Sequence, residues 1–315
     1  MSLILFDLEP AVLRDDVYFR EDFIALQARP DPVDTLETGD FRIGAAVRAI
    51  PGTTLTDLET PHGYGGPMAR DGAALAAGLA AWRTRQRAAG RVAEFIRLHP
   101  CLNPEALAGQ VDHLAFNRAT VMVELRAGRE ARRARYAKTT RNILRRTVET
   151  VSVRVLRPDE GPLFQALYEA MLARHGAAPS YYFPPAYFHE LLAAPWARTL
   201  VAEQAGEALA VSCFLAVPGV PLAHYHLSGG TAAGLAAQAQ YPLLEAAFDH
   251  YTEAGCAWMH LGGGRTPAED DGLWQFKAKF SPIQARFHVA GLIHDPEVFH
   301  ALGGSRGGRF LGYRG

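Results

Sequence analysis

The order of predicted elements between residues 151 and 293 limits the folds open to this chain. A strand and two helices precede a meander of three strands, and a further helix, a strand, a short helix and a last strand follow. We expect the strands of the meander to be neighbours in one sheet, with helices on its faces. The predicted class is α/β (mixed α+β). The predicted strands are 151–156, 198–204, 208–217, 221–228, "CAWMHL" and "IQARFHVAGL", and the longer helices are 159–174 and 185–194.

The first half of the chain repeats this order in abbreviated form. Strands are predicted at 3–8 and 41–50, and a helix runs from Asp71, its N-cap, to a stop at Gly90. The stretch "RVAEFIRLHP" and residues 119–125 read as further strands. No close sequence repeat accompanies the similarity, so the duplication is architectural. We expect domains at 1–149 and 150–315, with the final strand a candidate to pack on the first domain.

Composition is that of a globular protein without a global charge bias. The 315 residues are 49% hydrophobic and 21% charged, with a net charge of -1. Cys101, Cys213 and Cys256 show no metal-ligand spacing, and Cys213 in "AVSCFLAV" reads as a core thiol. The start has no basic region or cleavage site of a leader, and no apolar run is long enough for a membrane span. We therefore expect a reduced, cytoplasmic protein without a metal.

The basic residues are concentrated in one segment, 126–149, whose composition favours a helix. Nine cationic side chains there face only Glu130 and Glu149 as nearby acids. One interpretation is a solvated helix face that pairs with acids elsewhere in the fold. The other is a docking surface for the phosphates of a partner, with Arg141 and Arg145 as candidate contacts.

A glycine-rich loop, "TPHGYGGP" at 60–67, is the first candidate for ligand binding. Its glycines permit close approach of the backbone to a ligand, while Tyr64 offers a ring and a hydroxyl. Gly66 is the candidate for backbone approach to a substrate. The alternative is an ordinary loop with a buried tyrosine. The loop matches neither the phosphate-binding GxxxxGK[ST] pattern nor a dinucleotide GxGxxG pattern.

Two predicted strands carry histidines and run into glycines. In "LAHYHLSGG" His224 and His226 fall on one side of the strand and Tyr225 on the other, and His260 precedes the glycines of "HLGGG". Such histidines are often structural, but two of these strand ends side by side would form a cleft in which a neutral imidazole takes a proton from an amine. No zinc-site spacing accompanies them.

The stretch "LWQFKAKFS" holds two of the three lysines of a chain that otherwise uses arginine. Lys277 and Lys279 point about 200° apart on a helix, so only one of them is expected to enter a site. An ammonium there can act as a point charge on a phosphate or an oxyanion. The alternative is a pair of surface lysines flanked by the core residues Phe276 and Phe280.

Read together, these motifs resemble FemABX-type members of the GNAT acyltransferase superfamily. The resemblance extends from about residue 40 to residue 285, and "HLGGG" with the Phe-Lys-x-x-Phe stretch is its most specific part. It implies two GNAT-like halves in tandem with a cleft between them. It also implies transfer of an aminoacyl group from aminoacyl-tRNA to an amine of a peptide or peptidoglycan precursor, with no other cofactor.

The same resemblance implies roles for individual residues. The family's motif lysine falls on Lys277 and would serve the RNA donor or the developing charge. To these implied roles we add our own expectation that His226 or His260 handles the acceptor amine. Tyr64 and Tyr225 match tyrosines that line the acceptor cleft. The family's long helical hairpin is absent, and "SGGTAAGLAAQAQY" has no clean match to the pyrophosphate loop of acyl-CoA-dependent GNAT enzymes.

Two other functions fit the sequence. One is an acyl-CoA-dependent GNAT N-acetyltransferase acting on a small metabolite. The other is a GNAT-like module that binds RNA or a protein through the Arg-rich segment and catalyses nothing, in which case Lys277 and His260 would be replaceable.

Overall fold

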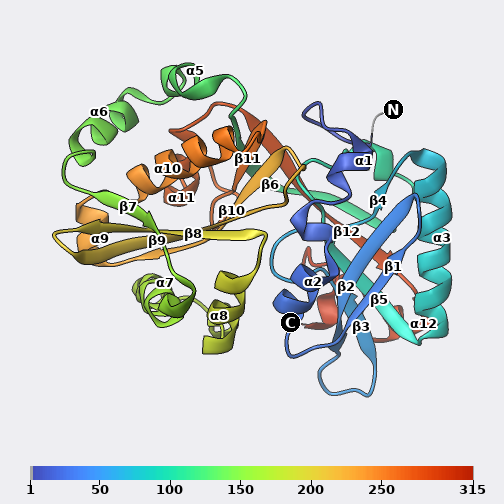
Figure 1. Ribbon diagram of the computed structural model, residues 1–315. Helices are drawn as coiled ribbons and strands as arrows, with labels where there is room; N and C mark the ends of the chain where they lie inside the picture. The colour runs from blue at the N-terminus through green and yellow to red at the C-terminus, as the bar shows by residue number, and fades with distance from the viewer. Residues whose placement is uncertain (1–2, 315) are drawn as a thin grey trace. The chain divides into compact units, whose positions relative to one another are not determined.

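Residues 3–314 are described in a computed structural model, in which the chain divides into two compact units (Figure 1). The first unit holds residues 1–119 and 285–315, and the second holds residues 120–284. Each unit contains a run of mixed parallel and antiparallel strands and the helices that cover it. Within the described residues, no helix has the length and apolarity needed to cross a membrane.

The first unit is built on the strand order β1-β2-β3-β5-β12, with the short β4 paired to β2. β1, β2 and β3 are antiparallel, β5 is parallel to β3, and β12 is antiparallel to β5. The strands are β1 (Val33–Glu37), β2 (Phe41–Ala49), β3 (Thr56–Glu59), β4 (Met68–Ala69), β5 (Arg91–Arg97) and β12 (Gln284–Ile293). The helices are α1 (Pro10–Leu13), α2 (Glu21–Ala28), α3 (Gly72–Ala88), α4 (Pro104–Leu107) and α12 (Pro296–Ala301).

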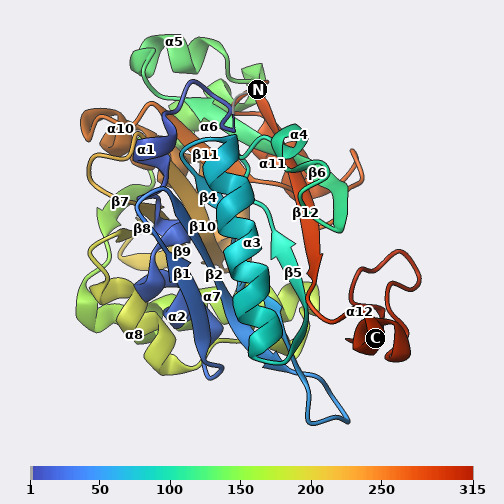
Figure 2. The same ribbon diagram turned by 90° about the vertical axis from the view of Figure 1, so that its right-hand side faces the viewer.

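Helix α3 connects the antiparallel strands of this unit to the parallel strand β5. The Asp71 side chain accepts a hydrogen bond from the backbone N–H of Ala74, which confirms the predicted N-cap. Leu75, Leu79 and Trp82 form one buried stripe at helical spacing. Figure 2 shows this helix lying across the face formed by β2 and β5.

The second unit has the strand order β6-β11-β10-β9-β8-β7. β7 to β10 form an antiparallel meander, β11 is parallel to β10, and β6 is antiparallel to β11. The strands are β6 (His113–Glu124), β7 (Ser152–Val155), β8 (Ala197–Gln204), β9 (Glu207–Ala216), β10 (Leu222–Gly230) and β11 (Trp258–Gly262). The predicted meander is confirmed, and the same succession of antiparallel, parallel and antiparallel neighbours occurs in both units.

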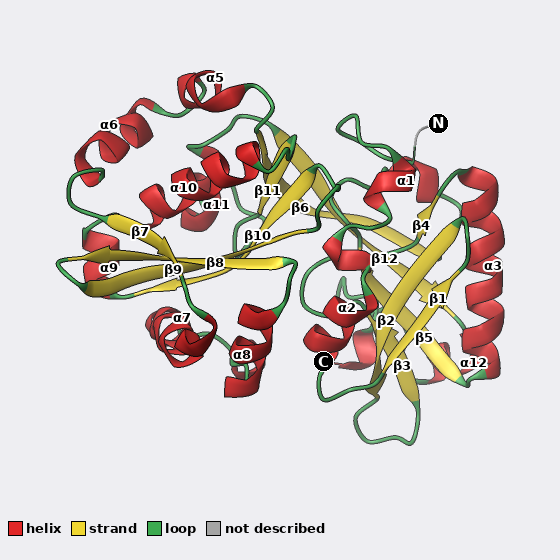
Figure 3. Ribbon diagram, in the orientation of Figure 1, coloured by secondary structure: helices red, strands yellow, loops and turns green. Residues whose placement is uncertain are grey.

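The helices of the second unit lie on opposite faces of its sheet (Figure 3). α7 (Gly161–His175) and α8 (Pro185–Ala193) cover one face. α5 (Gly128–Ala134), α6 (Lys138–Thr147), α10 (Gln240–Glu253) and α11 (Gly272–Ala278) lie over the other, and the short α9 (Ala232–Ala236) follows β10. The apolar core on the α10 side includes Phe214, Phe248 and Phe280.

The division between the units corrects the boundary expected at residues 149 and 150. Residues 120–149 belong to the second unit, because Arg132 on α5 forms an ion pair with Asp249 on α10 (2.6 Å). Residues 285–315 belong to the first unit, because β12 pairs with β5 and Arg314 binds the buried carboxylate of Asp57 on β3. The expectation that the final strand packs on the first domain is confirmed by β12, whereas the end of β6 was expected in the first half and belongs to the second unit.

The N-terminal expectation is also corrected. Residues 3–8 form no strand, since only Ile4 makes an isolated bridge, to Leu102, and Phe6 and Asp7 have positive φ angles. Within the apolar run "LILF" Ile4 is buried, and Leu8 two residues after the run is buried as well. The short strands β1 and β3 were not predicted, because neither has an extended apolar alternation.

Candidate functional site

The candidate site lies where the two parallel strands β10 and β11 separate. Their ladder ends at the pair formed by His224 and His260. Beyond it, β10 continues against β9 as far as Gly230, whereas Gly262 of β11 faces Val121 of β6. In open α/β sheets, ligands bind outside the carboxyl ends of parallel strands. The diverging ends of β10 and β11 have that position in the second unit.

A bulge in β10 lies directly after this point. Tyr225 faces Phe214 of β9 and Leu227 faces Cys213, so His226 is an extra residue in the ladder. A bulge redirects side chains and interrupts backbone pairing, and bulges are common beside binding sites. The strict alternation assumed for residues 224 to 226 therefore does not hold.

Lys277 and Tyr225 are brought together on the face covered by α10 and α11. The Lys277 ammonium donates a hydrogen bond to the carbonyl oxygen of Gly263 (2.9 Å) and lies 5.5 Å from the centre of the Tyr225 ring. Only 7% of Lys277 is exposed. Burial raises the pKa of the Tyr225 hydroxyl, although hydrogen bonding with Ser228 and Ser212 opposes the change. Tyr225 is therefore a neutral ring beside a buried cation.

The loop between β11 and α11, residues 263–271, is organised by one carboxylate. Oδ1 of Asp271 accepts from the backbone N–H groups of Leu273 and Trp274, and Oδ2 accepts from those of Arg265 and Thr266. Burial alone would raise the pKa of this carboxyl, but the four N–H donors lower it to about 2. Asp271 was not predicted as a site residue, although an Asp before a helix-favouring stretch is a recognisable N-cap signal.

The two predicted catalytic histidines contact different neighbours. His260 is buried, and its ring is 5.8 Å from that of His224 in an edge-to-face arrangement. His226 instead has Nε2 3.3 Å from the hydroxyl of Tyr187 on α8. The structure thus brings Tyr225 to Lys277 and brings His226 to the helix on the opposite face. No local sequence signal indicated Tyr187.

Tyr64 and Gly66 belong to the loop that follows β3 in the first unit. The Tyr64 ring packs edge to face on Tyr18 (5.3 Å) and Phe287 (5.1 Å), and burial raises the pKa of its hydroxyl to about 12. Gly66 has a φ of +105°, and a Cβ there would lie 2.9 Å from the Leu98 side chain. The backbone conformation and the packing both account for this glycine.

The Arg-rich segment does not form one helix, since it divides at Tyr136 and Ala137 into α5 and α6. On α6, Arg141 donates to the carbonyl oxygen of Tyr136, and Arg145 donates to Oδ1 of Asn142 (2.6 Å). Four cations of α6 have no carboxylate within 4 Å among residues 3–314: Lys138, Arg141, Arg145 and Arg146. Arg141 and Arg145 therefore present uncompensated charge.

The three cysteines are unpaired and buried. The interpretation of Cys213 as a core thiol is confirmed, since it is fully buried and burial raises the pKa of its thiol to about 12.

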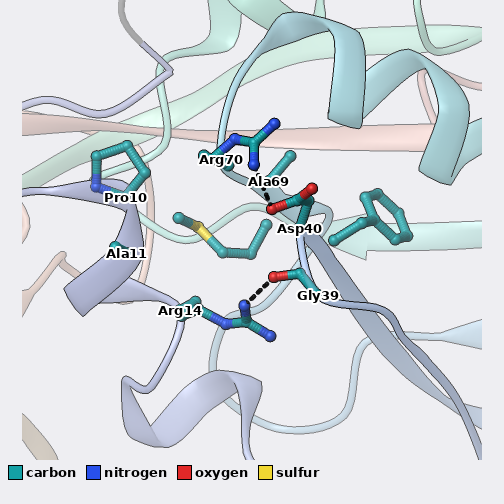
Figure 4. Close-up of a pocket in the computed structure, with 9 residues that line it drawn as sticks. Pro10, Ala11, Arg14, Gly39, Asp40, Ala69 and Arg70 are labelled. Carbon is teal, nitrogen blue, oxygen red and sulfur yellow. Dashed lines mark hydrogen bonds and ion pairs between the residues drawn. The ribbon is translucent and has the colours of Figure 1, made fainter.

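A cavity of about 110 Å³ in the first unit is lined by residues of α1, β2 and β4 (Figure 4). Its polar groups already bind one another: Arg14 donates to the carbonyl oxygen of Gly39, and Arg70 forms an ion pair with Asp40 (2.8 Å). None of the predicted site residues lines it.

Comparison with known proteins identifies the class of this fold. Residues 129–277 match the family model described as the acetyltransferase (GNAT) domain. No curated protein matches the chain in sequence with significance. This segment is thus a GNAT domain, and it contains Lys277, Tyr225, His226 and His260.

Solved structures specify the fold further. A structure titled as FemX has 10% identity and a TM-score of 0.72, covering 93% of this chain and 97% of that chain. The C-terminal domain of a putative lysylphosphatidylglycerol synthetase from Agrobacterium fabrum has 18% identity and a TM-score of 0.62, covering 93% and 92%. A tandem GNAT protein from the clavulanic acid biosynthesis pathway has 13% identity and a TM-score of 0.50, covering 85% of each chain. The chain has a FemX-like fold of two GNAT-like halves in tandem, and the match to the acetyltransferase (GNAT) domain lies in its second half.

Proposed function

We propose that the protein is an N-acyltransferase that moves an aminoacyl group from aminoacyl-tRNA to an amine of a peptide or peptidoglycan precursor. The observation that carries this proposal is the buried ammonium of Lys277 at the diverging ends of β10 and β11, within a GNAT domain. The likeness to FemX supports transfer to a peptide amine. Charged tRNA as donor implies a cytoplasmic enzyme, and no other cofactor is required.

The chemistry is a direct transfer without a covalent enzyme intermediate. The acceptor nitrogen attacks the carbonyl carbon of the aminoacyl ester, a C–N bond forms, and the C–O bond to the ribose breaks. Lys277 would stabilise the negative charge that develops on the carbonyl oxygen or on the departing ribose oxygen. A neutral His226 or His260 would accept the proton that the amine loses and return it to the departing ribose oxygen, with Tyr225 beside the reacting group.

The donor phosphates are assigned to α6. Arg141 and Arg145 present guanidinium groups without carboxylate partners, which suits them to phosphate oxygens. Their neighbours Lys138 and Arg146 extend the charge along the helix. A docking surface of this kind positions the RNA, and the reacting ester is then held by the groups around Lys277.

The acceptor is assigned in part to the loop after β3 in the first unit. The Tyr64 hydroxyl remains protonated at physiological pH, because burial raises its pKa to about 12. It can therefore donate a hydrogen bond to an oxygen or nitrogen of the amine substrate. Gly66 would contribute through the backbone path that it permits, in addition to its packing against Leu98. A Tyr64→Phe variant should raise KM for the acceptor more than it changes the affinity for RNA.

The donor is tested by binding of the purified protein to bulk charged tRNA at several salt concentrations, with acetyl-CoA as competitor. Binding should weaken steeply with salt and be unaffected by CoA. The double variant Arg141→Gln/Arg145→Gln should reduce the slope of log K against log salt concentration by about two. The control Arg129→Gln/Arg133→Gln on α5 removes the same charge from arginines that already form ion pairs, so it should change this slope less. Equal effects of the two variants would contradict the assignment of α6.

Catalysis is tested separately with Lys277→Ala. Removal of one charge-stabilising group typically lowers kcat by about 100- to 1000-fold, so single-turnover transfer from charged tRNA should fall by that order. Lys279→Ala is the matched control, because Lys279 is two residues away and less buried. Full activity of Lys277→Ala would contradict the role assigned to Lys277. RNA binding without transfer by the unmodified protein would instead indicate a binding module without catalysis.

A second candidate is an acyl-CoA-dependent N-acetyltransferase, favoured by the GNAT domain model and the tandem GNAT structure. The glycines at the end of β10 and in α9 argue against a phosphate cradle there. A Cβ at Gly229 would lie 2.4 Å from the carbonyl oxygen of Leu167, and one at Gly234 would lie 2.2 Å from that of Leu209. These glycines are thus explained by packing. Binding of acetyl-CoA without affinity for RNA would favour this candidate.

A further inference from the structure

The carboxylate of Asp271 binds both the first turn of α11, the helix that contains Lys277, and the loop that precedes this helix. Oδ1 of its carboxylate caps the first turn of α11 through the N–H groups of Leu273 (2.9 Å) and Trp274 (3.0 Å). Oδ2 accepts from the N–H groups of Arg265 and Thr266, both at 3.0 Å. A helix N-cap needs only the first pair of bonds, so the second pair is an additional function of this side chain.

The same loop is closed at its other end by Lys277. Its ammonium binds the carbonyl oxygen of Gly263, the residue that directly follows β11. The chain runs from Gly263 through the loop to Asp271 and along α11 to Lys277, and the hydrogen bond from Lys277 to Gly263 closes this segment into a ring. Because α11 is one short helix, a change in the orientation of its first turn moves the ammonium at its last turn.

Gly264 shows how tightly this arrangement is packed. A Cβ at this position would lie 2.6 Å from Oδ1 of Asp271 and 3.1 Å from its Cβ. The carboxylate thus fills the space that a side chain at residue 264 would need. This contact explains the third glycine of "HLGGG" through packing alone.

We propose that Asp271 is a positioning residue, whose carboxylate fixes the 263–271 loop and α11 so that the Lys277 ammonium stays on the Gly263 carbonyl and beside the Tyr225 ring. The expected effect of Asp271 on the rate of acyl transfer rests on the proposed role of Lys277. Its effect on the position of the Lys277 ammonium is independent of that role. In this arrangement Asp271 touches no substrate. It determines where the charge is held.

The chain offers a direct measurement, because it contains only three lysines. Lysine-selective isotope labelling should give three side-chain NMR signals, from Lys138, Lys277 and Lys279. The signal of Lys277 is expected to be displaced by the ring of Tyr225, 5.5 Å from its ammonium. Lys277→Arg removes that signal and so assigns it.

Two variants disturb the Asp271 contacts in different ways. Asp271→Asn retains one acceptor for the helix cap but places an NH₂ group against the N–H donors of the loop. Gly264→Ala keeps the carboxylate and displaces it. In both variants the Lys277 signal should move toward those of Lys138 and Lys279. Asp295→Asn is the matched control, since Asp295 caps α12 through the N–H of Val298 (3.0 Å) in the other unit.

The outcomes separate positioning from catalysis. A Lys277 signal that stays in place in folded Asp271→Asn and Gly264→Ala overturns the proposal, whatever the donor. A moved signal with a kcat that falls by about 10- to 100-fold at little changed KM supports it together with the role of Lys277. A moved signal with unchanged transfer, when Lys277→Ala is also fully active, supports the positioning by Asp271 and contradicts the proposed catalytic role of Lys277.

Discussion

Helices α5 and α6 come from one Arg-rich stretch, but they differ in how their charges are compensated. Arg129, Arg132 and Arg133 on α5 form ion pairs with Glu245 or Asp249 on α10. The cations of α6 have no carboxylate within 4 Å in residues 3–314. The first helix is thus held to the core by its charges, while the charges of the second are left without a carboxylate partner among the described residues.

The difference arises from residues far away in the sequence. Glu245 and Asp249 stand more than a hundred positions after α5 and lie one turn apart on α10, so both carboxylates face the same neighbouring helix. α6 packs through its apolar residues Ile143 and Leu144 and leaves its cations outward. The lesson is that a run of arginines has no single role. The position of acidic residues in the fold decides whether each arginine forms an ion pair within the protein.

The largest effect should come from Arg132, which is 1% exposed and bound to Asp249 (2.6 Å), Tyr136 (2.9 Å) and Thr252 (3.2 Å). Arg132→Ala leaves the buried acid Glu245 with less compensation, so unfolding free energy should fall by about 3–5 kcal/mol. Urea denaturation followed by circular dichroism measures this. A loss below about 1 kcal/mol would show that α5 is no more tied to the core than α6.

A smaller loss is expected for Tyr136→Phe. The Tyr136 hydroxyl accepts from Nε of Arg132 and donates to Oε2 of Glu245 (2.7 Å). Burial first, and then the charge of Glu245, raises the pKa of this hydroxyl, so it remains a donor at any accessible pH. Loss of both bonds should cost about 1–3 kcal/mol in the same denaturation measurement. An unchanged midpoint would indicate that the network does not depend on this link.

Arg129→Ala should have a minor effect on stability. Its guanidinium is 57% exposed although it lies 2.7 Å from Asp249, and exposed pairs typically contribute about 0–1 kcal/mol. A double-mutant cycle with Asp249→Asn isolates the pair. A coupling energy larger than that of Arg132 with Asp249 would reverse the order proposed for α5.

The sequence predicts elements well where its pattern is local. The Asp71 cap, the Leu75–Leu79–Trp82 stripe and the meander of β8, β9 and β10 all follow from residue types at short spacing. The predicted single helix over 126–149 is wrong, because Ala137 leaves the helical conformation where its N–H binds the carbonyl oxygen of Lys279. That contact is not visible in local sequence.

The candidate site was predictable in part for the same reason. The rarity of lysine singled out Lys277, and its burial beside Tyr225 agrees with one of two lysines entering a site. The bulge at His226 depends on how β10 pairs with β9, and the link to Tyr187 depends on the packing of α8. Neither leaves a local pattern. Asp271 did leave one, but a cap signal does not show that the other carboxylate oxygen binds a loop.

The smallest effect on stability should come from α6 itself. Arg141 and Arg145 are four residues apart, and like charges at that spacing destabilise a helix by about 0.2–0.5 kcal/mol. Relief of this repulsion in Arg141→Gln/Arg145→Gln opposes the loss of the Arg141 bond to the Tyr136 carbonyl, so unfolding free energy should change by no more than about 0.5 kcal/mol. The same variant should bind charged tRNA more weakly, which separates a surface kept for a ligand from one kept for the fold. A clear loss of stability without a change in RNA binding would place α6 with α5, as a helix whose arginines serve the structure.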